Sequence, residues 1–111
     1  MNVNFNGYNE KVLTFIADSG ITEPGVPVKM SADGTVAKCG GNEAFCGICV
    51  GLRDGYAAVQ LSGYVRTPAG GKIAVGYKKL AADGNGGVAV NSSGREFLVV
   101  DSTATEIGFI L

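Results

Sequence analysis

The residues of this 111-residue chain best suited to redox or metal chemistry are three closely spaced cysteines, Cys39, Cys46 and Cys49. A zinc site prefers four nitrogen or sulfur ligands, and without any histidine the fourth ligand could only be a carboxylate. A thioredoxin-like CxxC pair opens a helix, whereas Cys46–Cys49 lies in an apolar run that no predicted helix follows. We therefore favour buried, reduced cysteines that act as small apolar side chains, with a redox or metal site as the alternative.

Other residues that could do chemistry are better explained as turns. Gly70-Gly71-Lys72 and the glycine-rich run 84–87 lack the GxxxxGK[ST] spacing and the following helix of a phosphate loop. Asp33 and Asp83 could form a carboxylate pair, but each precedes a glycine and is expected at an exposed turn tip. The absence of histidine also excludes Ser-His-Asp and Cys-His nucleophile pairs. We predict that the protein is not an enzyme and binds no cofactor.

Charge and hydropathy exclude two classes of partner. Nine basic and ten acidic residues give a net charge of −1, and the longest basic run is Lys78-Lys79. A nucleic-acid or anionic-membrane surface would need a larger basic patch. No apolar run is long enough for a transmembrane helix, and the polar N-terminal residues do not resemble a secretory signal. We expect a protein made in the cytoplasm that binds neither nucleic acid nor membrane.

The elements that must position these residues are predicted to be short β-strands. Turn signals such as Asp33-Gly34, Asp54-Gly55 and Asp83-Gly84 recur about every ten residues, which is typical of all-β sandwiches and barrels. The predicted strands lie between them, at Lys11–Ala17, Tyr56–Val65, Phe97–Val100 and Glu106–Leu111. The segment 45–52 also has helical spacing, but Gly47 and Gly51 disfavour a helix, so a strand or irregular turn is expected there.

An internal repeat predicts two similar β units. KMSADG at Lys29–Gly34 returns as KLAADG at Lys79–Gly84, and Val36-Ala37 matches Val88-Ala89. We further match Phe45 to Phe97 and Ser62–Val65 to Ile107–Ile110. The expected fold is therefore all-β, a small β-barrel in a single domain, residues 11–111, in which half-repeats at about 25–66 and 75–111 close on each other.

Two sets of residues are candidates for contact with a partner protein. Residues 1–10 are expected to form an extended N-terminal arm, because Val3, Phe5 and Tyr8 alternate with Asn and Gly. Such an arm could add a strand to another chain, or pair with its own barrel. The second set is an aromatic patch that contains the tyrosines Tyr56, Tyr64 and Tyr77. Ordinary half-buried strand tyrosines are the alternative.

The chain resembles the capsid decoration proteins, also called cement or head-stabilising proteins, of tailed phages. The resemblance covers about residues 25–111 and rests on GVPVKMSADGTVAKC, FCGICVGLRDGYAAVQLSGYVRTP, VGYKKLAADGNGGV and REFLVVDSTATEIGFIL. It implies a β-barrel virion structural protein of a phage or prophage, a homotrimer that binds the major capsid protein on the outside of the head. Such a protein needs a rigid body and an interface, not a reactive group.

Two other classes of function remain open on the sequence alone. A small ligand-binding or regulatory β-barrel would hold a molecule in its mouth, and a largely apolar cavity would favour that hypothesis. A barrel filled by Val, Leu and Ile side chains would oppose it. The third hypothesis is a redox or metal protein that uses Cys39, Cys46 and Cys49.

Overall fold

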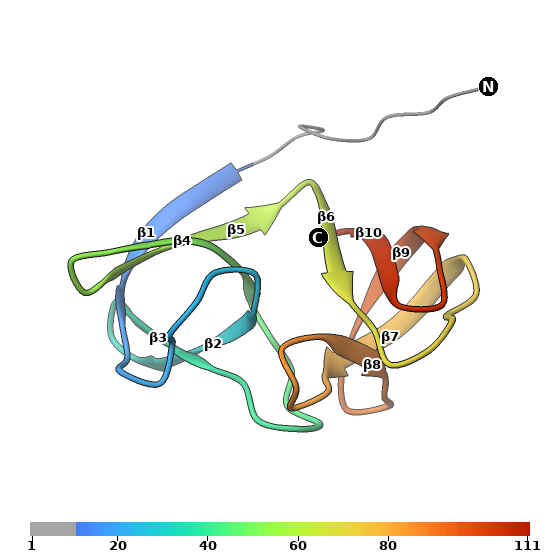
Figure 1. The fold of residues 1–111 in the computed structure, drawn as a ribbon, viewed down its shortest axis with the longest axis horizontal. Coiled ribbons are helices and arrows are strands. Elements are labelled where there is room, and N and C mark those ends of the chain that lie inside the picture. Colours follow the sequence, from blue (N-terminus) through green and yellow to red (C-terminus); the bar gives the residue numbers. More distant parts are fainter. Residues whose placement is uncertain (1–10) are drawn as a thin grey trace.

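Ten strands form two β units that lie side by side (Figure 1). The computed structural model describes residues 11–111. The first unit is a closed barrel with the strand order β1-β3-β2-β4-β5, and the second is a five-stranded sheet with the order β6-β10-β9-β7-β8. The strands of the first unit are β1 (Lys11–Ala17), β2 (Pro27–Ala32), β3 (Thr35–Lys38), β4 (Gly47–Arg53) and β5 (Tyr56–Ser62). Those of the second are β6 (Tyr64–Pro68), β7 (Gly76–Ala82), β8 (Val88–Val90), β9 (Arg95–Ser102) and β10 (Glu106–Ile110).

The all-β class and the presence of a closed barrel are confirmed, while the predicted N-terminal arm, residues 1–10, lies outside the described residues. The strand at Lys11–Ala17 is confirmed, and β4 shows that the segment after Gly47 is a strand and not a helix. Between β4 and β5, Asp54 and Gly55 both have positive φ angles, 51° and 83°. This is the Asp-Gly hairpin that the sequence predicts. The described residues contain no helix that could cross a membrane.

The two units share one strand order, and β4 and β5 correspond to β9 and β10 with a shift of 50 residues. In the first unit Cys49 pairs with Val59, and in the second Val99 and Phe109, each 50 positions later, pair in the same way. A bulge follows this pair in both sheets. Strand β1 runs antiparallel to β5 and parallel to β3, while β6 runs antiparallel to β10 and reaches β8 through one parallel bridge, from Ala69 to Val88. The predicted repeat is therefore a repeat of strand order.

Three details of the predicted repeat are wrong. The half-repeats do not close on each other in one barrel, because each unit forms its own sheet. The 50-residue shift aligns Phe97 with Gly47, so Phe45 is not its equivalent. The same shift aligns Ile107–Ile110 of β10 with residues 57–60 of β5, so the match to Ser62–Val65 is out of register.

The predicted strand at Tyr56–Val65 is also interrupted. Gly63 has a φ of 91°, in the region that disfavours residues with a side chain. The chain turns there from β5 of the first unit into β6 of the second (Figure 1). Alternation along 56–65 continues through this position, so hydrophobic pattern alone could not locate the break.

Each unit has its own cluster of buried apolar side chains. The first barrel is filled by small and branched residues that have little or no exposed surface, chiefly Val28, Val36, Cys49, Ala57 and Val59. The second cluster is larger and contains the aromatic residues Phe97 and Phe109. Its apolar residues come from both units, because Cys39, Phe45 and Ile48 of the first unit belong to it.

Phe45 is the main apolar contact between the units. It lies in the loop between β3 and β4, and its ring stacks on Phe97 with a centroid distance of 5.2 Å and an interplanar angle of 8°. The ring also meets Phe109 edge-on at 6.1 Å, and Phe97 and Phe109 are 5.3 Å apart. With 4% of its surface exposed, Phe45 fills the second unit with a side chain from the first.

Hydrogen bonds hold the same loop against β7. The Asn42 N–H donates to the carbonyl of Ala82 at 2.8 Å, and the Ala82 N–H donates to the carbonyl of Glu43 at 2.9 Å. The Glu43 carboxylate accepts a hydrogen bond from the Gly40 N–H and pairs with Lys29 of β2. This ion pair lowers the pKa of Glu43, chiefly through the hydrogen bond from Lys29. The middle of the β3–β4 loop is thus bound to β7 of the second unit and, through Glu43, to β2 of the first.

Replacing Phe45 by Ala is expected to destabilise the protein by about 3–5 kcal/mol, because a buried ring is lost and a cavity opens between the units. Urea denaturation measures the change. The control is Tyr56→Ala, which truncates an aromatic ring that is 54% exposed and should change the free energy of unfolding by about 0.5 kcal/mol or less. Equal losses for both variants would contradict the assigned role of Phe45.

Gly47→Ala tests the closure of the first barrel. A Cβ at Gly47 would collide with the backbone oxygen of Gln60 and with the side chain of Val59, and the backbone can yield only if β4 moves away from β5. We expect a loss of about 1–3 kcal/mol in the free energy of unfolding. Gly70→Ala is the matched control, since a Cβ there meets nothing within 4 Å. A Gly47→Ala variant as stable as the control would show that the barrel is not closed tightly at this point.

Candidate functional site

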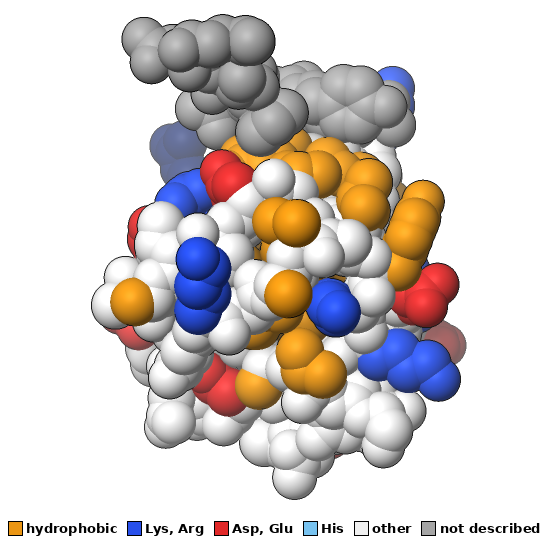
Figure 2. Space-filling model, turned by 90° about the vertical axis from the view of Figure 1, so that its right-hand side faces the viewer, with side chains coloured by type: hydrophobic (Ala, Val, Ile, Leu, Met, Phe, Trp, Pro, Cys, Tyr) orange, Lys and Arg blue, Asp and Glu red, His pale blue; other side chains and the backbone are white. Residues whose placement is uncertain are grey.

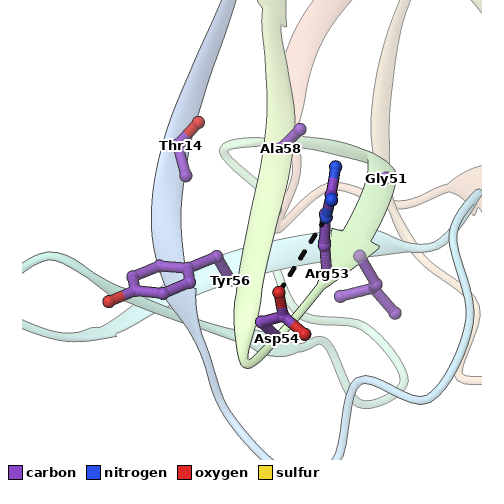
Figure 3. A pocket seen from close by; sticks show the side chains of 7 residues that line it. Thr14, Gly51, Arg53, Asp54, Tyr56 and Ala58 are labelled. Carbon is purple, nitrogen blue, oxygen red and sulfur yellow. Dashed lines mark ion pairs between the residues drawn. The ribbon is translucent and has the colours of Figure 1, made fainter.

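The candidate site is a shallow groove of about 440 Å³ on the outer face of the first barrel, beside Tyr56 (Figure 3). Three adjacent strands of the closed barrel, β1, β5 and β4, supply its lining. The lining residues are Thr14, Gly51, Leu52, Arg53, Asp54, Tyr56 and Ala58.

Strand register explains how the groove forms. Ala58 of β5 lies between Thr14 of β1 and Gly51 of β4, and these small residues make a low floor. Tyr56, two residues earlier on the same face of β5, lies between Ile16 and Arg53. In Figure 3, Tyr56 and Arg53 project to opposite sides of β5. Tall side chains therefore flank a floor of small ones.

The groove carries little electrostatic character. Arg53 and Asp54 form an ion pair at 3.9 Å, but their side chains are 93% and 87% exposed. A pair so exposed contributes almost nothing to stability and stays free to rearrange. The exposed surface of this face is mainly apolar, since the side chains of Tyr56 and Ile16 are 54% and 52% exposed. The arrangement suits contact with a protein surface better than catalysis.

Strand β1 adds an open edge to the apolar face. Its residues Lys11–Phe15 pair with β5 on one side, while β3 pairs with β1 only at Ile16 and Ala17. Within residues 11–111, no strand pairs with the other side of Lys11–Phe15. Val12 and Leu13 on this stretch are 44% and 56% exposed. An open edge with apolar side chains can accept an added strand.

The predicted tyrosine patch is not one surface. Tyr56 belongs to the groove, whereas Tyr64 and Tyr77 lie in the second unit, on the outer face of its sheet. Tyr77 is 68% exposed, but Tyr64 is 7% exposed, so its side chain is no contact surface in the described structure. The other predicted contact residues, Val3, Phe5 and Tyr8, lie outside the described residues.

Tyr64 takes part in a polar cluster instead. Arg66 Nη1 donates to the Tyr64 hydroxyl at 3.2 Å and to the Asp101 carboxylate at 2.9 Å, and Arg66 Nε donates to Glu106 at 3.2 Å. These partners, Tyr64 first, raise the pKa of Arg66. A side chain at Gly108 would collide with both Tyr64 and Asp101, so the glycine makes room for the cluster. Its members satisfy one another, which is typical of a structural network.

Asp33 and Asp83, which were considered for acid–base chemistry, lie between strands at turns as predicted, but only Asp33 is exposed, whereas Asp83 is half-buried. Asp83 accepts hydrogen bonds on Oδ1 from the Asn85 N–H at 2.7 Å and the Gly87 N–H at 3.1 Å, which fixes the turn between β7 and β8. Asp33 lies at the corresponding turn between β2 and β3. The two carboxylates are at separate turns of separate units.

The cysteines lie in two different cores. Cys39 belongs to the cluster between the units and Cys49 to the interior of the first barrel, and both are buried, as predicted. Cys46 is half-buried. Burial raises the pKa of all three thiols and brings that of Cys39 to about 11. At neutral pH the thiolate, which is the reactive form, is therefore scarce.

The groove was not predicted from the sequence. Gly51 and Ala58 are ordinary small residues in a strand pattern, and only their pairing across β4 and β5 places them under one open surface. The exposed residues of β1 carried a weak signal, because Val12, Leu13 and Ile16 leave no consistently polar face on this strand.

Thiol labelling tests this account of the cysteines. In the native protein at pH 7.5 we expect an aromatic disulfide reagent to react with the thiols at least about tenfold more slowly than in the denatured chain, where all three become accessible. Cys46 should be the fastest of the three, because Cys39 and Cys49 are buried. Rapid native labelling of Cys39 would contradict the assignment of these cysteines as packing residues and would favour a reactive site.

Comparison with known proteins adds no family assignment. No protein-family model matches the chain, and no curated protein matches it.

Proposed function

We propose that this protein is a non-enzymatic virion structural protein, a decoration protein that binds the outside of a phage or prophage head and stabilises it. The observation that carries the proposal is β1, which presents apolar side chains and an open backbone edge on a closed barrel. The partner is the major capsid protein. The sequence resemblance to decoration proteins supports the same role.

Strand addition explains why such a protein would have this edge. The N–H and C=O groups of Lys11–Phe15 that point away from β5 have no strand partner within residues 11–111, and pairing them with a strand of the partner would give affinity through the backbone. Tyr56 and Ile16 then provide apolar contact on the adjoining face. An uncovered apolar edge is an aggregation hazard, and a bound strand of the partner would cover it.

The barrel itself provides stiffness and not a ligand cavity. Its interior is filled by Val28, Val36, Val59, Ala57 and Cys49, none of which has more than traces of exposed surface. A small molecule in the mouth of the barrel would have to displace these side chains. The alternative of a ligand-binding barrel therefore has less support than a surface function.

As a decoration protein, the chain would act as a homotrimer on the virion exterior after synthesis in the host cytoplasm. Three linked copies multiply a modest contact with the shell, because the second and third contacts form at high effective concentration. Residues 1–10 precede the open edge of β1 directly, and we assign them to the same contact.

Binding to purified heads tests the proposal. The protein is mixed with unexpanded and mature heads of the phage or prophage that encodes it, and co-sedimentation is measured. We expect binding to at least one form and loss of at least about tenfold in affinity for Tyr56→Asp and for Ile16→Asp, because each puts a charge into the apolar contact. Failure of the unaltered protein to bind either form would refute the proposal.

Two further variants locate the contact. Deleting residues 1–8 should weaken binding to heads while leaving the thermal unfolding midpoint unchanged. Val90→Asp is the matched control, since Val90 is 56% exposed like Tyr56 but lies on β8 of the second unit. This control should bind normally; equal losses for Val90→Asp and Tyr56→Asp would place the contact elsewhere.

A further inference from the structure

The repeat in strand register reveals how the two units contact each other. On the outer face of the first barrel, Pro27, Ile48 and Gln60 form one row across β2, β4 and β5. All three are buried, and Ile48 belongs to the cluster of the second unit. Gln60 Nε2 donates to the carbonyl of Tyr64, the first residue of the second unit, at 2.9 Å. This row is therefore part of the contact surface of the first unit.

The same row exists in the second unit and has no partner unit within the described chain. Its members are Tyr77, Leu98 and Ile110, each 50 positions after its equivalent and paired in the same order across β7, β9 and β10. Tyr77 is 68% exposed, and Leu98 and Ile110 are half-buried. Figure 2 looks onto the side of the molecule that the second unit forms and shows apolar side chains among scattered charges.

The complementary surface is also duplicated. In the second unit, Val65 and Leu80 belong to the cluster that receives Phe45 and Ile48, and they are 5% and 0% exposed. Val59 and Phe109 occupy equivalent positions in the two units. Leu13 pairs with Val59, and Val65 pairs with Phe109, so Leu13 is the equivalent of Val65. The 50-residue shift likewise makes Met30 the equivalent of Leu80. Leu13 and Met30 are 56% and 48% exposed.

The chain therefore uses the row of the first barrel and one end of the second sheet internally, and within residues 11–111 it leaves the row of the second sheet and the equivalent end of the first barrel uncovered. We propose that the uncovered pair forms an interface between copies of this chain, in which the row Tyr77–Leu98–Ile110 of one copy packs on Leu13 and Met30 of the next. The contact repeats the two surfaces of the internal one but has no counterpart of Phe45, because the connection between β8 and β9 is a short turn. It follows from the repeat alone and does not depend on binding to a phage head.

Such a contact is head-to-tail, because two different surfaces meet. Every copy carries both surfaces, so copies can close into a ring or continue as a chain of molecules. A closed ring of three copies would contain six units, joined alternately by the contact inside the chain and by the contact between copies. The proposal thus supplies an interface for the homotrimer.

Complementation between variants tests the head-to-tail geometry. Sedimentation equilibrium on the full chain is expected to show association beyond the monomer mass of 11.3 kDa as concentration rises. Tyr77→Asp and Met30→Asp should each remain monomeric, with Leu13→Asp as a second variant of the barrel end. An equimolar mixture of Tyr77→Asp and Met30→Asp should form a 1:1 complex, because each variant keeps the surface that the other has lost.

Controls separate this interface from the groove beside Tyr56; because Leu13 also lies on the open edge of β1, Met30→Asp is the barrel-end variant that leaves that edge unaltered. Tyr56→Asp should associate like the unaltered chain, and so should a variant without residues 1–10. Thermal unfolding of every variant shows whether it has folded; Leu13→Asp replaces Met30→Asp in the mixture if the latter unfolds. Binding of the unaltered chain to heads is measured in parallel, so that failure to bind heads together with normal self-association contradicts only the proposed function.

Three outcomes would overturn the interface. The first is an unaltered chain that stays monomeric up to its solubility limit, and the second is a pair of single variants that associate normally. The third is a mixture that remains monomeric, since a symmetric contact, in which both copies use the same surface, would behave in this way. Loss of association on removing residues 1–10 would also contradict the interface, because it would show that the N-terminal segment of one copy, and not the row of Tyr77, contacts the next copy.

Discussion

The stacking of Phe45 on Phe97 is the contact on which the arrangement of the molecule depends. The two units have the same strand order but differ in how their interiors are filled. Gly47 in the first unit occupies the position of Phe97 in the second, and there is no space for even a Cβ at Gly47. The first barrel is therefore closed tightly around small residues, whereas the second sheet encloses large rings and accepts one more from its neighbour.

This difference in how the two interiors are filled also explains the connections between the strands. Because Phe45 must reach the second unit, the connection between β3 and β4 is a long loop, while its equivalent between β8 and β9 is a short turn. The loop brings Asn42 and Glu43 to the edge of β7, where backbone hydrogen bonds fix it. The groove and the open edge of β1 lie on the first barrel outside this contact. The surfaces proposed for partners are thus separate from the surface that holds the units together.

The sequence contained the local rules of this fold and not its contacts between units. Asp54-Gly55, the strand at Lys11–Ala17 and the repeated ADG turns could be predicted because turn chemistry and alternation act over a few residues. The break at Gly63 was hidden, since apolar alternation runs through it. Phe45 resembled a strand residue because nothing near it in sequence shows that its partners lie more than 50 residues away. Of the candidate site, Tyr56 was predicted, but its groove required the pairing of Gly51 with Ala58.

The two connections between the units also determine how the molecule carries load. A single covalent crossing at Gly63 would make a hinge, about which one unit could swing. The β3–β4 loop adds a second attachment at a different place (Figure 1), so a torque on one unit meets resistance at a distance from the pivot. With two attachments at separate points, the two units are expected to move as one rigid body. A force applied at β1 would then pass to the far edge of the second sheet with little bending between them.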